Sequence, residues 1–151
     1  MFTLVPSHFF DPASAREALA EVADLKEGQV VASLDIPQYD AVLVYAQDGD
    51  SVVDTPEIYK ILMQLPNCPE YNKILCGILD DTLYLAVAQG KSLLLANSFP
   101  ARDFTTAEYY IFLALNSLQL NPEISTVCFL TPLDAEDEMS LYRYFKAVEK
   151  L

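Results

Sequence analysis

The stretch KILCGILDDTLYLAVAQGKSLLLANSF, residues 73–99, decides the fold of this chain. Three apolar segments lie within it, at residues 73–79, 82–88 and 92–99. Apolar runs of this length bounded by turn residues are typical of β-strands. Asp80-Asp81 separates the first two segments, and Gln89-Gly90 separates the last two. Because glycine readily adopts the positive φ of a tight hairpin turn, we expect three consecutive antiparallel strands.

A helix, a strand and a second helix are expected to follow. Thr105 and Glu108 match a capping box, in which each side chain accepts a hydrogen bond from the other's backbone N–H, and this predicts a helix over residues 104–120. A fourth strand is expected over residues 124–130, and a closing helix from Asp134 to the basic residues near the end of the chain. The order βββαβα is that of a ribonuclease H-like unit, whose α-β-α crossover adds a parallel strand.

The first 66 residues predict the order βαββα. Its strands are expected at residues 2–5, 30–36 and 41–46. Asp11-Pro12 and Thr55-Pro56 each place an acceptor side chain before a proline, as at a helix start. The two helices then carry apolar stripes: Ala15, Ala18, Leu19 and Val22 in the first, and Ile58, Ile61, Leu62 and Leu65 in the second. Gly28 is expected to end the first helix, and Asp48-Gly49 to form a turn.

The segment Pro66-Asn67-Cys68-Pro69 is the expected seam of the chain. It separates an N-terminal lobe, residues 1–66, from a ribonuclease H-like lobe, residues 70–151. The segment is short and has apolar neighbours, so we expect lobes that pack together, as two lobes or as one domain, rather than a free linker. The predicted class is an α+β fold with a mixed sheet, in the order βαββα then βββαβα.

The charge of the chain restricts its partners. Its 151 residues carry 22 acidic and 9 basic side chains, a net charge of −13. Such a surface repels a phosphate backbone, so nucleic acids and anionic membranes are not expected partners. No apolar run approaches the ~20 residues of a membrane-spanning helix, and the N-terminal residues lack the features of a secretory signal. A cytoplasmic location is therefore expected.

The cysteines do not predict a disulfide or a metal site. Cys68, Cys76 and Cys128 are odd in number and lack the CxxC spacing of zinc sites. We expect buried free thiols, as in a reducing cytoplasm.

Two parts of the chain resemble a known family: VPSHFFD at residues 5–11, and LLLANSF at 93–99 leading into FTTAEYY at 104–110. They are similar to an uncharacterised bacterial family, a domain of unknown function with an actin-like ATPase fold. The resemblance covers essentially the whole chain and corresponds to the central and C-terminal part of the longer family members. It implies an actin-like architecture and no known activity.

The resemblance also indicates where a nucleotide would bind. Actin-like ATPases hold phosphates with Asp- and Gly-containing hairpin turns, whose backbone N–H groups meet the oxygens. The equivalent turn here, Leu79-Asp80-Asp81-Thr82, has acids and a threonine but no glycine. Two adjacent carboxylates would repel phosphate unless a metal intervened. A solvated turn is the simpler interpretation, and a degenerate nucleotide- and Mg²⁺-binding site at Asp80, Asp81 and Thr82 is the alternative.

Other catalytic arrangements are poorly supported. A two-metal nuclease would have to use Asp80 or Asp81 with Glu108 and Asp134, each of which is better explained by a turn or a helix cap. His8, the single histidine, would have to serve any nucleophilic triad, and no G-x-S-x-G motif is present. No cofactor and no metal are expected.

Aromatic side chains are the remaining signal. The predicted helices carry six of them: Tyr109, Tyr110, Phe112, Tyr142, Tyr144 and Phe145. A helix that is apolar almost all round, such as 104–120, must be covered on two sides, by the sheet and by the other lobe or a second chain. The leading interpretation is a non-enzymatic protein-interaction or scaffold domain that binds a protein partner or itself through apolar helix surface.

Overall fold

A computed structural model describes residues 2–48 and 55–151, so Gly49 of the predicted Asp48-Gly49 turn lies outside the described residues. The chain divides into two compact units, residues 1–59 and 60–151. The division falls inside helix α2 (Glu57–Gln64), whereas the sequence placed the seam at residues 66–69. The boundary lies earlier than predicted because the end of α2 belongs to the second unit. Its side chains Ile61, Leu62 and Leu65 are completely buried.

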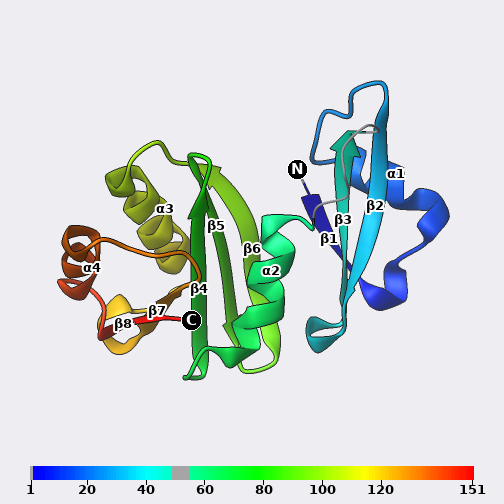
Figure 1. The fold of residues 1–151 in the computed structure, drawn as a ribbon. Coiled ribbons are helices and arrows are strands. Elements are labelled where there is room, and N and C mark those ends of the chain that lie inside the picture. The colour runs from blue at the N-terminus through cyan, green and yellow to red at the C-terminus, as the bar shows by residue number, and fades with distance from the viewer. Residues whose placement is uncertain (1, 49–54) are drawn as a thin grey trace. The chain divides into compact units, whose positions relative to one another are not determined.

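The first unit is a three-stranded antiparallel sheet with one helix (Figure 1). Its elements are β1 (Phe2–Pro6), α1 (Ala15–Ala20), β2 (Gln29–Ile36) and β3 (Ala41–Asp48). The strand order is β1-β3-β2, and Leu19 of α1 packs with Val42 and Val44 of β3. The predicted start of the first helix is confirmed in part, since the Asp11 side chain accepts a hydrogen bond from Ala13 N at 3.0 Å at the start of a 3-10 turn that leads into α1.

The predicted end of that helix was wrong. The helix ends at Ala20, and Ala23 N donates to Leu19 O in the turn that follows. Val22 therefore lies outside the helical stripe and is exposed. Gly28, with a φ of +87°, instead forms the turn before β2.

The second unit contains a five-stranded mixed sheet. Its elements are β4 (Asn72–Leu79), β5 (Thr82–Gln89), β6 (Ser92–Pro100), α3 (Phe104–Ser117), β7 (Thr126–Phe129), α4 (Ala135–Tyr142) and β8 (Ala147–Lys150). The strand order is β6-β5-β4-β7-β8; the first three strands pair antiparallel, and β7 is parallel to both β4 and β8. The predicted meander and added parallel strand are confirmed.

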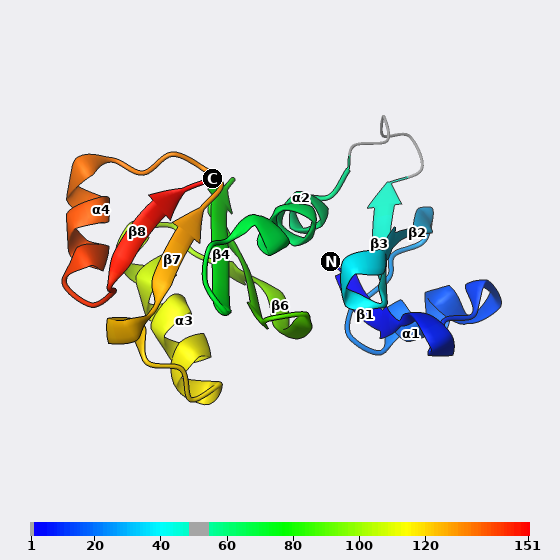
Figure 2. The same ribbon diagram turned by 90° about the horizontal axis from the view of Figure 1, so that it is seen from below.

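Helices cover both faces of this second sheet. Helices α3 and α4 lie on one face, and the C-terminal part of α2 lies on the other (Figures 1 and 2). Between the sheet and α3, a buried core contains Ile74, Leu85, Ile111, Val127 and Phe129. On the opposite face, α2 packs closely on β4, because a Cβ built at Gly77 would lie 3.0 Å from Ile61 Cδ1.

Two local predictions in the second unit were wrong. The N-cap of α3 is Asp103, which accepts a hydrogen bond from Thr106 N at 2.7 Å, so Thr105 and Glu108 form no capping box. The closing helix starts after Asp134 as predicted, but it ends at Tyr142. Phe145 then enters the core, and the chain continues as β8, which satisfies the free backbone edge of β7. The order of the second half is βββαβαβ.

Candidate functional site

The turn between β4 and β5 presents the predicted Asp80, Asp81 and Thr82. Both aspartates are exposed and have positive φ angles, 50° and 55°. Thr82 Oγ1 donates to Asp80 O at 3.2 Å, and Ala101 N donates to Asp81 O at 2.8 Å. Aspartate tolerates the left-handed region better than most residues, so this geometry suits a two-residue hairpin turn. The turn brings the three residues together, with both aspartates exposed to solvent.

The other candidates for chemistry are not brought together. Glu108 accepts a hydrogen bond from Ser140 Oγ at 2.8 Å, and Asp134 caps α4. Over residues 2–48 and 55–151, no three His, Cys, Asp or Glu side chains are grouped as metal ligands. His8 is exposed, with its ring centroid 4.2 Å from that of Phe9. Within this described part of the chain, none of the helices has the length and hydrophobicity needed to cross a membrane.

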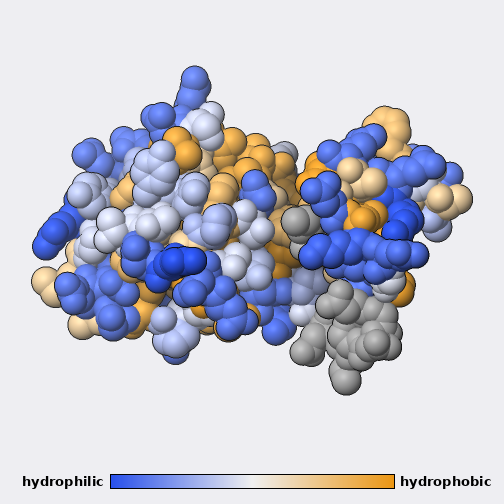
Figure 3. Space-filling model, turned by 90° about the horizontal axis from the view of Figure 1, so that it is seen from above, coloured by the Kyte–Doolittle hydropathy of each residue, from blue (hydrophilic) through white to orange (hydrophobic). Residues whose placement is uncertain are grey.

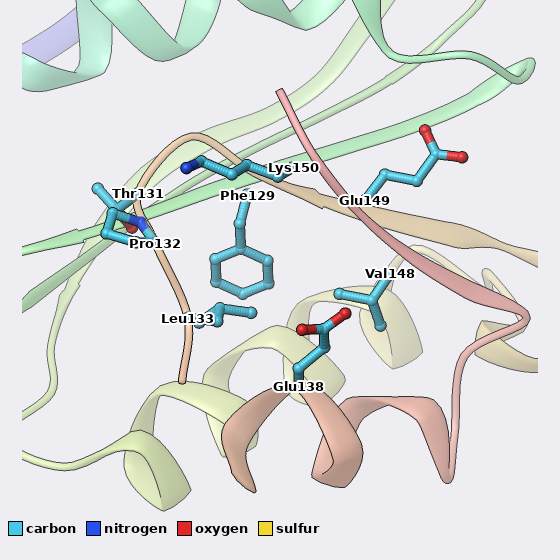
Figure 4. Close-up of a pocket in the computed structure, with 8 residues that line it drawn as sticks. All are labelled: Phe129, Thr131, Pro132, Leu133, Glu138, Val148, Glu149 and Lys150. Atoms are coloured by element: carbon cyan, nitrogen blue, oxygen red, sulfur yellow. The ribbon is translucent and has the colours of Figure 1, made fainter. Parts of the chain in front are cut away.

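A small pocket lies at the carboxyl ends of β7 and β8, beside the start of α4 (Figure 4). Its volume is about 130 Å³. Phe129 points into it between Leu133 and Val148, and the Glu138 carboxylate and the Lys150 side chain lie at its border. No local sequence pattern predicts this pocket, because its residues become neighbours only when β8 pairs with β7.

The outer faces of α3 and α4 expose large apolar side chains. Tyr109 is 60% exposed and Leu113 47% exposed, four residues apart on one side of α3. Phe112 packs beside them against Tyr144, which follows α4, with ring centroids 4.9 Å apart, and Tyr144 is 50% exposed. We call Tyr109, Phe112, Leu113 and Tyr144 the α3–α4 surface. Helix α3 is thus covered by the sheet of its own unit, while Tyr109 and Leu113 on its outer side stay exposed.

Carboxylates gather at the start of α4, where Asp137 lies near Glu108 of α3. Asp134 is the N-cap of α4, and Glu136, Asp137 and Glu138 lie in its first turn. Glu108 of α3 accepts a hydrogen bond from Ser140 of α4. Partial desolvation and the neighbouring Asp134 and Glu136 carboxylates raise the pKa of Asp137. Hydrophilic side chains also cover much of the face drawn in Figure 3, with apolar side chains exposed among them. The α4 start therefore carries a concentrated negative potential that favours a cation.

The two sheets and their helices make this an α+β protein, and a structural match assigns it to the actin-like ATPase fold class. The structure superposes with a TM-score of 0.80 on a protein from Bacteroides thetaiotaomicron described as having an actin-like ATPase fold and unknown function. The two sequences are 17% identical, and the match covers 99% of this chain and 64% of that protein. The chain thus spans less than two thirds of its structural relative. A comparison with curated proteins finds no match.

The chain belongs to the family described as "Protein of unknown function (DUF3822)", whose model matches residues 55–148. The predicted resemblance to an uncharacterised family of actin-like fold is confirmed.

Proposed function

We propose that this chain is a protein-binding module whose α3–α4 surface holds a basic amphipathic segment of another protein. The observation that carries the proposal is the exposure of Tyr109 and Leu113 on α3, the helix whose Glu108 lies near Asp137 of α4. A segment with apolar residues on one side and Lys or Arg along its border would match both features.

The apolar half of the match rests on rigid aromatic groups. Phe112 is fixed between Tyr144 and Phe145, whose ring centroids lie 4.9 and 5.6 Å from its own. Aromatic side chains held in place by neighbours lose little conformational entropy on binding and are enriched at protein interfaces. Phe112 and Tyr144 therefore supply apolar contact area that is already held in place.

The charged half of the match selects the partner. The five carboxylates around the start of α4 attract cationic side chains and steer their approach. The same carboxylates and the net charge of −13 disfavour a second copy of this chain and disfavour nucleic acid. A basic segment of a different protein is the partner that both the local carboxylates and the net charge favour.

The test uses the full chain and a synthetic helical peptide that carries leucines on one face and lysines on the other. We expect saturable binding that weakens with added salt, and at least about tenfold weaker binding by a Tyr109→Ser/Leu113→Ser variant. Ile124→Ser, which changes an exposed apolar residue of the same unit, is the matched control and should bind normally. An acidic control peptide, in which each lysine is replaced by glutamate, should not bind. Equal binding by the double variant, or equal binding of the acidic peptide, would contradict the proposal.

A second candidate is a relic nucleotide- and Mg²⁺-binding turn at Asp80, Asp81 and Thr82. Two consecutive aspartates with positive φ support it, because sparsely populated backbone conformations cluster at functional sites. Thermal unfolding with Mg-ATP, Mg-ADP and Mn²⁺ tests it, since a ligand that binds only the folded state raises the unfolding temperature. A saturable rise that Asp80→Asn/Asp81→Asn abolishes would favour this candidate, and no rise at millimolar ligand would exclude it.

A further inference from the structure

Two buried cysteine thiols converge on one face of the second sheet. Along β4, Ile74 and Cys76 point into the core beneath α3, so Leu75 and Gly77 point to the opposite face, where Ile61 of α2 packs. Along β7, Val127 and Phe129 point beneath α3, so Cys128 also points to the α2 face.

The segment that follows α2 brings Cys68 to the same place. Cys68 Sγ lies 4.0 Å from the carbonyl oxygen of Ile74, whose neighbour Leu75 pairs with Cys128 in the parallel register. Two residues after Cys68, Glu70 accepts a hydrogen bond from Thr126 Oγ1 at 3.2 Å. Thr126 lies two residues before Cys128, on the same face of β7. Contacts on both sides thus hold Cys68 against β7.

The Cys68–Ile74 contact and the β4–β7 register place the two thiols next to each other. A hydrogen bond with Cys128 and burial raise the pKa of Cys68, whereas the same hydrogen bond lowers the pKa of Cys128. Cys68 is 3% exposed and Cys128 is completely buried, and both are free thiols, as is Cys76. Because Cys76 lies on the other face of the sheet, it cannot reach either partner without unfolding of the strand.

We propose that Cys68 and Cys128 are a redox-active pair that hydrogen peroxide, small and uncharged enough to enter the fold, converts to a disulfide. The Cys128 thiolate attacks one peroxide oxygen, which breaks the O–O bond, forms a sulfenic acid and releases one water after protonation. Cys68 sulfur then attacks Cys128 sulfur and displaces a second water. Two thiols lose two electrons and two protons, and one peroxide is reduced to two waters.

The bridge would fix the segment after α2 to the centre of the second sheet. It would join residues far apart in the sequence and so would constrain the unfolded chain more than the folded one. The oxidised protein is therefore expected to unfold at a higher temperature than the reduced protein, and a thiol reductant should reverse the change.

The experiment treats the full folded chain with hydrogen peroxide, alkylates the remaining thiols after denaturation and maps disulfide-linked peptides by mass spectrometry without reduction. We expect one linked pair, Cys68 with Cys128, and an alkylated Cys76. The Cys76→Ala variant should form the same bridge to the same extent. Cys68→Ala should form no bridge and should instead leave a sulfenic acid at Cys128 that dimedone traps.

Three results would overturn the proposal. They are a bridge that includes Cys76, cross-links only between two chains, and three thiols that stay fully alkylatable after prolonged treatment. The wild-type mapping decides between these results by itself, so the conclusion does not depend on whether each variant folds.

Discussion

Ser140 of α4 donates a hydrogen bond to Glu108 of α3 through its hydroxyl, with 2.8 Å between Ser140 Oγ and Glu108 Oε1. One helical turn further along, Phe112 of α3 meets Tyr144 after α4. The two contacts are in register, so they fix the two helices side by side. This arrangement makes one continuous surface from two elements that are separate in the sequence.

Removal of the Ser140–Glu108 contact should loosen this pair of helices. We expect Ser140→Ala to lower the free energy of unfolding by about 0.5–1.5 kcal/mol, the usual net value of one hydrogen bond. In a double-mutant cycle, Ser140→Ala should lower the free energy of unfolding of the Glu108→Ala protein only slightly, because the hydrogen bond is already absent there. Urea titrations of the four proteins measure the cycle, and additive effects would show that the contact contributes nothing.

The N-cap of α3 provides a second prediction, which includes a pH dependence. Backbone and side-chain hydrogen bonding to Thr106 lowers the pKa of Asp103. A carboxyl with a lowered folded-state pKa stabilises the protein above its unfolded-state pKa, about 3.9 for aspartate, and this stability is lost as the pH falls through the lower folded-state value.

Asp103→Ala should therefore lower the unfolding temperature at neutral pH. The difference from wild type should shrink as the pH falls below the unfolded-state pKa of aspartate, about 3.9. Thr105→Ala is the matched control, because Thr105 is not the N-cap and should have a smaller effect. A larger loss for Thr105→Ala than for Asp103→Ala would restore the capping box that the sequence predicted.

The β4–β5 turn should respond to backbone preference. Asp80 and Asp81 both have positive φ, which β-branched residues adopt at a considerable cost. We expect Asp81→Val to destabilise the protein by roughly 1–2 kcal/mol and Asp81→Gly to be close to neutral. Chemical denaturation gives both values, and equal effects of valine and glycine would contradict the left-handed turn.

The C-terminal residues should behave as part of the core. Phe145 is buried beside Phe112, so Phe145→Ala should cost about 3–5 kcal/mol. Met139→Ala, which changes an exposed side chain of α4, should stay within about 0.5 kcal/mol of wild type. Amide hydrogen exchange should also show slow exchange along β8, and fast exchange there would argue against its pairing with β7.

The sequence predicts most of the elements because their signals are local. Gly90 has a positive φ of 57° in the β5–β6 turn, as the Gln89-Gly90 pair predicted, and Asp134 caps α4. The apolar stripe of α2 is buried along its whole length, from Ile58 to Leu65. Turn chemistry, helix caps and strong periodicity therefore carried enough information to give the order of the elements up to α4.

The errors occurred where long-range pairing decides the structure. The bases Arg143, Lys146 and Lys150 predicted the end of a helix, yet residues 147–150 form β8 because they pair with the exposed edge of β7. Glu108 matched a capping-box position, yet its partner is Ser140, 32 residues away. The pocket beside Phe129 and the Cys68–Cys128 pair also depend on these pairings. Such contacts leave no local pattern that a single sequence could reveal.

The measurement that tests the central claim most directly is amide hydrogen exchange of the full chain with and without the leucine–lysine peptide. We expect slower exchange over residues 104–117 and 135–144, which carry the α3–α4 surface, and unchanged exchange in the β4–β5 turn. The acidic peptide should leave the whole profile unchanged. Protection confined to the first unit or to the β4–β5 turn, or no protection at saturating peptide, would contradict the account.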